Sequence, residues 1–151
     1  MKKILFITVL FLVSFTEMNA QSYEYKIVTS IESVVPMGLG RSRIISENEE
    51  KNYKDFTSER TEENKKQNKS KRGDAKVDDF EETKLVNFYS AVGINFQNVA
   101  SNDALLSSKV NTMITDGWDL VFVTSGVESD AGKGDGKGIF ITRFIFKRLK
   151  Q

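Results

Sequence analysis

The residues with the clearest potential for chemistry lie in the segment Gly38-Leu39-Gly40-Arg41-Ser42-Arg43. Backbone N–H groups in a glycine turn, together with guanidinium groups that donate paired hydrogen bonds, can bind a carboxylate or a phosphate. On a strand, Arg41 and Arg43 point to the same face. They are therefore the candidate ligand-binding residues, for a small anionic ligand or a protein partner. The alternative is that both arginines pair with the acidic residues that follow.

Several other chemistries are excluded by composition. The chain of 151 residues contains no His and no Cys, which rules out disulfides, thiol nucleophiles, histidine-based zinc sites and catalytic triads. The glycine-rich stretch 129–138 has neither the acidic spacing of a calcium loop nor the pattern of a phosphate-binding loop. We expect no metal and no cofactor, and an enzyme would have to use carboxylate, Lys, Tyr, Ser or Thr chemistry.

Charge and the N-terminus indicate the compartment. With 22 Lys and Arg against 21 Asp and Glu, the chain lacks the basic excess of nucleic-acid binders. Residues 1–20 have the pattern of a secretory signal peptide. Lys2 and Lys3 precede the apolar run Ile4 to Phe15, and the predicted peptide ends at a small residue, Ala20. The run is too short to span a bilayer. We expect a periplasmic or secreted protein without a transmembrane segment after processing; the alternative is a buried N-terminal helix.

The remaining residues 21–151 predict a single α+β domain. Alternation from Tyr23 predicts a strand, as does 94–99. The clearest helix covers Asn102–Asp116, with Ser101 or Asn102 as its cap and Gly117 ending it in a left-handed conformation. Its apolar stripe comprises Leu105, Leu106, Val110, Met113 and Ile114. Trp118 begins the next strand and is expected in the core. Together these elements predict a small antiparallel sheet of four to five strands with one main packed helix.

The last predicted strand, 138–147, is apolar on both faces, with phenylalanines on one and isoleucines on the other. Such a strand belongs in a sheet that is covered on two sides, and one helix can cover only one of them. The second face must be covered by the 83–99 region or by another subunit. The sequence therefore indicates a homodimer as one candidate state.

More than half of the residues from Ser46 to Glu82 are charged, and few are apolar. A segment of this composition cannot bury enough apolar area to offset the entropy of ordering it. We expect a flexible charged insertion at about 46–82. The spacing of opposite charges would support a solvated helix over 47–66.

Three pieces of the sequence, in order, match a known family. Tyr23-Glu24-Tyr25-Lys26-Ile27-Val28, then Gly117-Trp118-Asp119-Leu120-Val121 after the helix, then the terminal Phe146-Lys147-Arg148, resemble the "YEYKVV", "GWELV" and "FKR" of the bacterial domain of unknown function family 4177. The match is to a secreted, expanded relative, because the short members lack the region 38–99. The resemblance implies a small α+β fold with one packed helix, and no activity.

The functional expectation is an exported, non-catalytic binding or interaction module of unknown ligand. The alternatives are a small carboxylate-based hydrolase or lyase, and an accessory protein of envelope assembly. No paired-carboxylate motif supports the enzyme.

Overall fold

The computed structural model describes residues 21–33, 42–66, 69–90, 92–128 and 138–150. The predicted leader 1–20, Arg41 and most of the glycine-rich stretch lie outside the described residues. In chain order the elements are β1 (Tyr23–Ser33), β2 (Arg43–Glu47), the 3-10 helix η1 (Tyr53–Phe56), β3 (Phe80–Lys84), β4 (Tyr89–Ser90), β5 (Gly93–Ile94), α2 (Phe96–Thr115), β6 (Asp119–Val127) and β7 (Ile139–Leu149).

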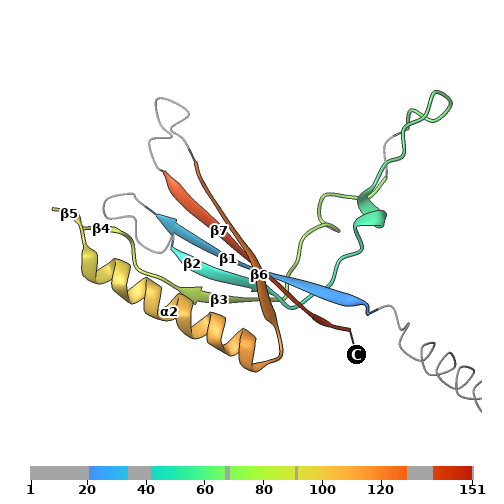
Figure 1. The fold of residues 1–151 in the computed structure, drawn as a ribbon. Helices are drawn as coiled ribbons and strands as arrows, with labels where there is room; N and C mark the ends of the chain where they lie inside the picture. The colour runs from blue at the N-terminus through green and yellow to red at the C-terminus, as the bar shows by residue number, and fades with distance from the viewer. Residues whose placement is uncertain (1–20, 34–41, 67–68, 91, 129–137, 151) are drawn as a thin grey trace, which may run out of the picture.

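Five of the strands form one antiparallel sheet in the order β3-β2-β1-β7-β6, and β4 and β5 form a separate two-stranded sheet. The two longest strands lie side by side near the middle, paired from Tyr23 opposite Leu149 to Ser33 opposite Ile139. Helix α2 runs beneath the sheet along one of its faces (Figure 1). The predicted α+β class, with a small antiparallel sheet and one main helix, is confirmed.

The core lies between α2 and this face of the sheet. Its buried members are Val28, Ile44, Leu85, Met113, Trp118 and Phe146, with Leu106, Val110 and Phe144 packed against them. Trp118 is in the core, as expected. The predicted stripe is correct for Leu106, Val110 and Met113 but wrong for Leu105 and Ile114, which are 41% and 53% exposed. The helix is therefore apolar along a narrow line only.

The helix begins earlier than predicted, and 94–99 is not a strand. Asn95 is the N-cap, because its side-chain oxygen accepts hydrogen bonds from the backbone N–H groups of Gln97 and Asn98. The C-terminal prediction is confirmed. Gly117 has a φ of 83°, and the bonds from Gly117 N–H to the Ile114 carbonyl and from Trp118 N–H to the Met113 carbonyl close a Schellman motif.

Asn102, one of the predicted caps, has a different role in the middle of the helix. It is completely buried. Its oxygen accepts from the Val86 N–H at 2.9 Å, and its amide nitrogen donates to the Val86 carbonyl at 2.8 Å and to the Glu32 carboxylate at 2.9 Å. One side chain therefore joins α2, β1 and the chain segment after β3.

Between β2 and β3, residues 48–79 project from the sheet as an arm (Figure 1). The strands extend into both ends of the segment predicted as an insertion. The predicted solvated helix over 47–66 is wrong; the described part of the arm contains only the four-residue η1. Oppositely charged pairs at i,i+4 stabilise a helix by about a few tenths of a kcal/mol each. This is too little to form a helix that has no apolar face to pack against the domain. At the base, Asn48 bonds Asp79 through backbone and side chain, at 3.0 and 3.1 Å.

The 83–99 region does not cover the second face of the sheet, so that expectation is wrong. Its first residues belong to β3, within the sheet itself. Further on, the ring of Phe88 meets Phe140 edge-on at 6.2 Å. Phe140 pairs with Glu32, whose side chain reaches α2. This region therefore lies on the helix side.

We predict that Asn102→Ala destabilises the fold by about 3 kcal/mol, because the buried Val86 N–H and carbonyl both lose their partner. The measurement is urea denaturation followed by circular dichroism. Asn111→Ala, at an exposed position of the same helix, is the matched control and should change stability by less than about 0.5 kcal/mol. Equal effects of the two substitutions would contradict this role.

Candidate functional site

Among the described residues, no helix lies over the face of the sheet opposite α2, and we call this side the open face. Alternation along each strand and the cross-strand register place its side chains. They are Tyr23, Tyr25, Ile27, Thr29 and Ile31 of β1; Arg43, Ile45 and Glu47 of β2; Phe80, Glu82 and Lys84 of β3; Phe122 and Thr124 of β6; and Ile141, Arg143, Ile145 and Lys147 of β7. A bulge between Leu120 and Phe122 brings Phe122, instead of Val121, onto this face.

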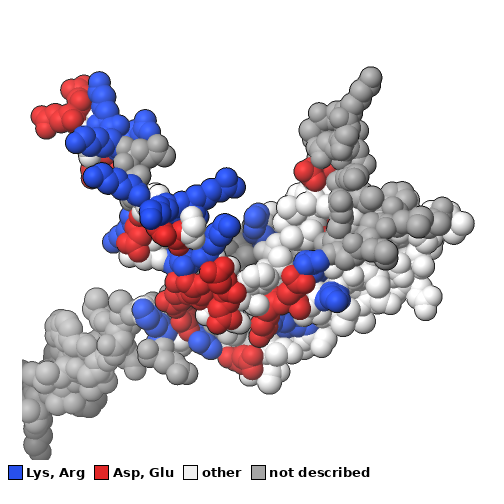
Figure 2. All heavy atoms as spheres, turned by 180° about the vertical axis from the view of Figure 1, so that it is seen from behind, with Lys and Arg blue, Asp and Glu red and all other residues white. Residues whose placement is uncertain are grey.

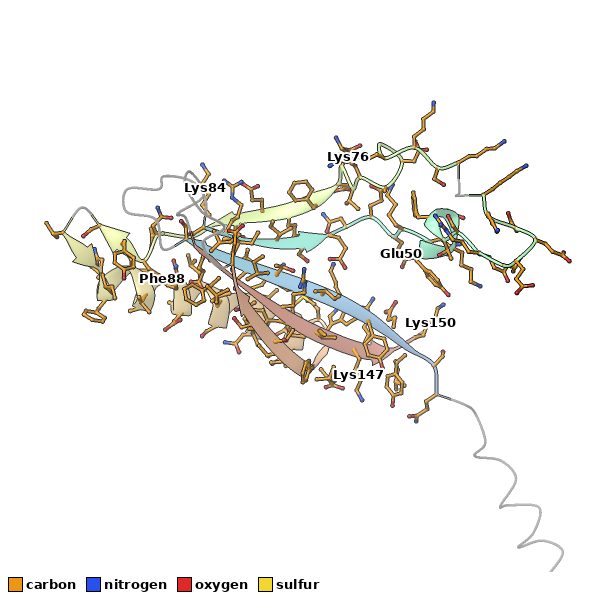
Figure 3. The ribbon with its side chains drawn as sticks, turned by 90° about the horizontal axis from the view of Figure 1, so that it is seen from above. Glu50, Lys76, Lys84, Phe88, Lys147 and Lys150 are labelled. Atoms are coloured by element: carbon orange, nitrogen blue, oxygen red, sulfur yellow. The ribbon has the colours of Figure 1, made fainter. Side chains whose placement is uncertain are left out.

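The open face exposes large apolar side chains. Phe122 is 60% exposed, Phe80 44% and Ile27 41%. One row across the sheet reads Phe80, Glu47, Ile27, Ile145 and Phe122. Seen from above, the arm leaves past the ends of β2 and β3, and α2 lies below the sheet (Figure 3). Neither element covers the centre of the face.

An apolar groove of about 300 Å³ lies where the arm meets the open face. It is lined by Ile27, Thr29, Ile45, Glu47, Val77 and Phe80. Val77 comes from the arm, and the other five come from β1, β2 and β3. A groove with this lining can accept apolar side chains and offers one carboxylate at its edge.

The two candidate arginines have different outcomes. Arg43 is on the open face, and its guanidinium contacts the Glu82 carboxylate at 2.6 Å. This is the pairing with a following acidic residue that the sequence left as the alternative. Arg41 lies outside the described residues, so anion binding by the two arginines together stays a prediction.

A second hollow, of about 420 Å³, lies at the end of the domain from which the arm leaves. Arg148 forms its centre: its guanidinium lies 4.3 Å from the centre of the Trp118 ring and is ion-paired with Glu24. Glu49 and Lys51 of the arm, also ion-paired with each other, line the opposite side. Figure 2 shows acidic side chains gathered at the base of the arm, with Lys and Arg dominating its projecting part.

This hollow was not predicted, although two of the three pieces that resemble the 4177 family supply Trp118 and Arg148. The signal available in the sequence was the position of Trp118 immediately after the helix-ending glycine. The stacking on Arg148 depends on the pairing of β6 with β7, which sets Asp119 opposite Lys147 and so brings Trp118 beside Arg148. This pairing leaves no local trace in the sequence.

Glu32 is a partly buried acidic group with a shifted pKa. Partial burial raises the pKa of Glu32 above its ordinary value, the hydrogen bond from Asn102 lowers it, and the nearby Asp103 charge raises it. Asn102 fixes the carboxylate between β1 and α2. The arrangement has the form of a structural contact, because no nucleophile or second acid is bonded to Glu32 among the described residues.

Other classes of site lack support in the described residues. Among residues 21–33, 42–66, 69–90, 92–128 and 138–150, no three acidic side chains lie close enough together to hold a metal ion. Within the same ranges, no helix has the length and apolarity needed to cross a membrane.

Comparison with known proteins gave no match: no family model, no curated protein and no solved structure matches the chain.

We predict that Glu32→Gln stabilises the protein near neutral pH. The folded-state pKa of Glu32 is raised, so the native protein gains stability as pH falls through that pKa and loses it as pH rises. Gln keeps the acceptor for Asn102 without the charge. Urea denaturation at a series of pH values should show the variant more stable than the wild type at pH 7, with the difference vanishing near pH 4. A pH-independent difference would contradict the assignment.

Proposed function

We propose that the protein is an exported, non-catalytic binding module that docks a protein partner on its open face. The observation that carries the proposal is the set of exposed apolar side chains Phe80, Ile27 and Phe122, which lie in one row on three of the five strands of the sheet. Soluble monomers rarely expose contiguous apolar patches of more than a few hundred Å² unless these are interaction sites.

The charged side chains of the face support the same function. Arg43 and Glu82 lie on β2 and β3, and Arg143 lies on β7 between Ile141 and Ile145. Protein–protein interfaces combine apolar and polar contacts, and arginine is enriched in them. On the expectation that residues 1–20 are a secretory leader, we propose that this interaction takes place in the periplasm or outside the cell. An accessory role in envelope assembly is compatible with the same surface.

The geometry supports the alternative, a carboxylate-based hydrolase or lyase, less well. Such an enzyme needs two converging carboxyl groups in different environments. In the hollow at the domain end, Glu24 is held by Arg148 and Glu49 by Lys51. The hydrogen bond from Lys51 lowers the pKa of Glu49 below its ordinary value, whereas a general acid requires a proton.

The kinship with the 4177 family remains part of the proposal. The observed order of a first strand, a helix ending in a glycine, and two closing strands fits what the resemblance implies, and the arm occupies part of the region that the short members lack.

The proposal predicts that substitutions on the open face abolish partner capture. Tagged exported protein and the variant Ile27→Lys/Phe122→Glu would each be used to isolate partners from the cell envelope and medium, because buried charges disfavour docking. Ser108→Lys, at an exposed position of α2, is the control. Equal recovery of the same proteins by the variant and the wild type would overturn the proposal; thermal unfolding verifies that both variants fold.

A further inference from the structure

We propose that the occupant of the open face is a second copy of this chain, packed sheet against sheet about a two-fold axis that runs along β1. This inference rests on the proposed function, because it names the partner of that same surface. The product would be a four-layer assembly with two sheets inside and one α2 helix on each outer side.

The area of the face is suited to such a dimer. Five strands at about 4.8 Å spacing and about 17–30 Å length give a projected face of about 400–700 Å². Side chains roughen this surface, so its accessible area approaches the roughly 800 Å² that each partner contributes to a stable interface of standard size.

The apolar residues match under this symmetry. A two-fold axis along β1 places β3 of one copy above β6 of the other. This rotation does not shift a residue along the strand direction, so residues of one cross-strand row, which we call a level, face the same row of the other copy. Phe80 and Phe122 occupy the same level on opposite edges of the sheet. Each would therefore meet the other across the interface, and Ile27 would meet Ile27 on the axis.

The charges match as well. Glu47 is on β2, and Arg143 is on β7 one level away. Neither makes an ion pair with another of the described residues. The axis along β1 brings Arg143 of one copy above Ile45 of the other, one level from Glu47 on one side and one level from Arg43 on the other. Arg43 is ion-paired with Glu82, so Glu47 is the favourable partner for Arg143, and symmetry makes this contact twice.

The other simple arrangement fits less well. A two-fold axis perpendicular to the strands would place β7 of one copy over β7 of the other. Each Arg143 would then face the β7–β6 side of the second copy, which carries its own Arg143. Like charges facing each other across an interface cost free energy. The complementary halves of the face therefore select the axis along β1.

The first test measures self-association of the purified exported protein by sedimentation equilibrium. We expect a dimer in the wild type and a dissociation constant raised about tenfold or more in Arg143→Glu and in Glu47→Arg. Each variant alone places like charges together, whereas a mixture of the two restores both contacts. Ser108→Glu is the matched control and should dimerise as the wild type does.

Recovery of dimer in the mixture supports the inference and shows that both variants fold. A wild type that is monomeric at about 100 μM, where even weak specific interfaces are populated, would overturn it. So would variants that dimerise as tightly as the wild type, or a mixture that stays monomeric. If self-association fails while the Ile27→Lys/Phe122→Glu variant still loses a captured protein, the proposed function stands and only the identity of the partner is wrong.

The second test uses the absence of cysteine from the chain, which gives a clean background for cross-linking. Ile27→Cys should link to itself in the dimer through a short bismaleimide, since packed sheets lie about 10 Å apart, beyond the reach of a disulfide. Ser108→Cys on the outer helix face should not link. Linking of Ser108→Cys but not of Ile27→Cys would overturn the inference.

Discussion

One helix cannot cover both faces of a sheet, and this constraint governs the rest of the structure. The sheet is apolar on both sides in its middle strands, and α2 packs on one of them with Val28, Ile44 and Phe146. The opposite side exposes Phe80 and Phe122. A hydrophobic surface of this kind raises the free energy of the isolated molecule in water, so association through it is favourable. The proposed binding role rests on this exposed surface and not on a catalytic motif.

On the covered side, polar contacts set the position of the helix as much as apolar packing does. The narrow apolar line of α2 leaves its rotation weakly defined. Asn102 removes this freedom, because its hydrogen bonds to Val86 and Glu32 can form in one orientation only. Lys109 and Glu81 add an ion pair of 2.7 Å between the helix and β3. The open face is consequently presented by a well-defined sheet.

Local signals in the sequence were sufficient for part of this account. The alternating pattern from Tyr23 indicated the fold class. The glycine after the helix indicated where the helix ends. The two apolar faces of the last strand indicated that the second face of the sheet needs a cover. The residues that were misplaced are those whose role depends on distant partners. Asn102 looks like a cap until Val86 is beside it. For Arg43 the sequence offered a following acidic residue as a partner, but only the pairing of β2 with β3 identifies it as Glu82. The bulge that turns Phe122 outward also arises from strand pairing.

Hydroxyl-radical footprinting of the purified protein over a range of concentrations tests directly whether a second copy covers the open face. We expect the oxidation of Phe80 and Phe122 to fall as the concentration rises, while Leu105 and Ile114 on the outer side of α2 are oxidised equally throughout. Constant oxidation of both phenylalanines up to about 100 μM, a concentration that populates weak specific complexes, would contradict a second copy on the open face. Protection of Leu105 and Ile114 instead would mean that the two copies contact each other through α2 and not through the open face.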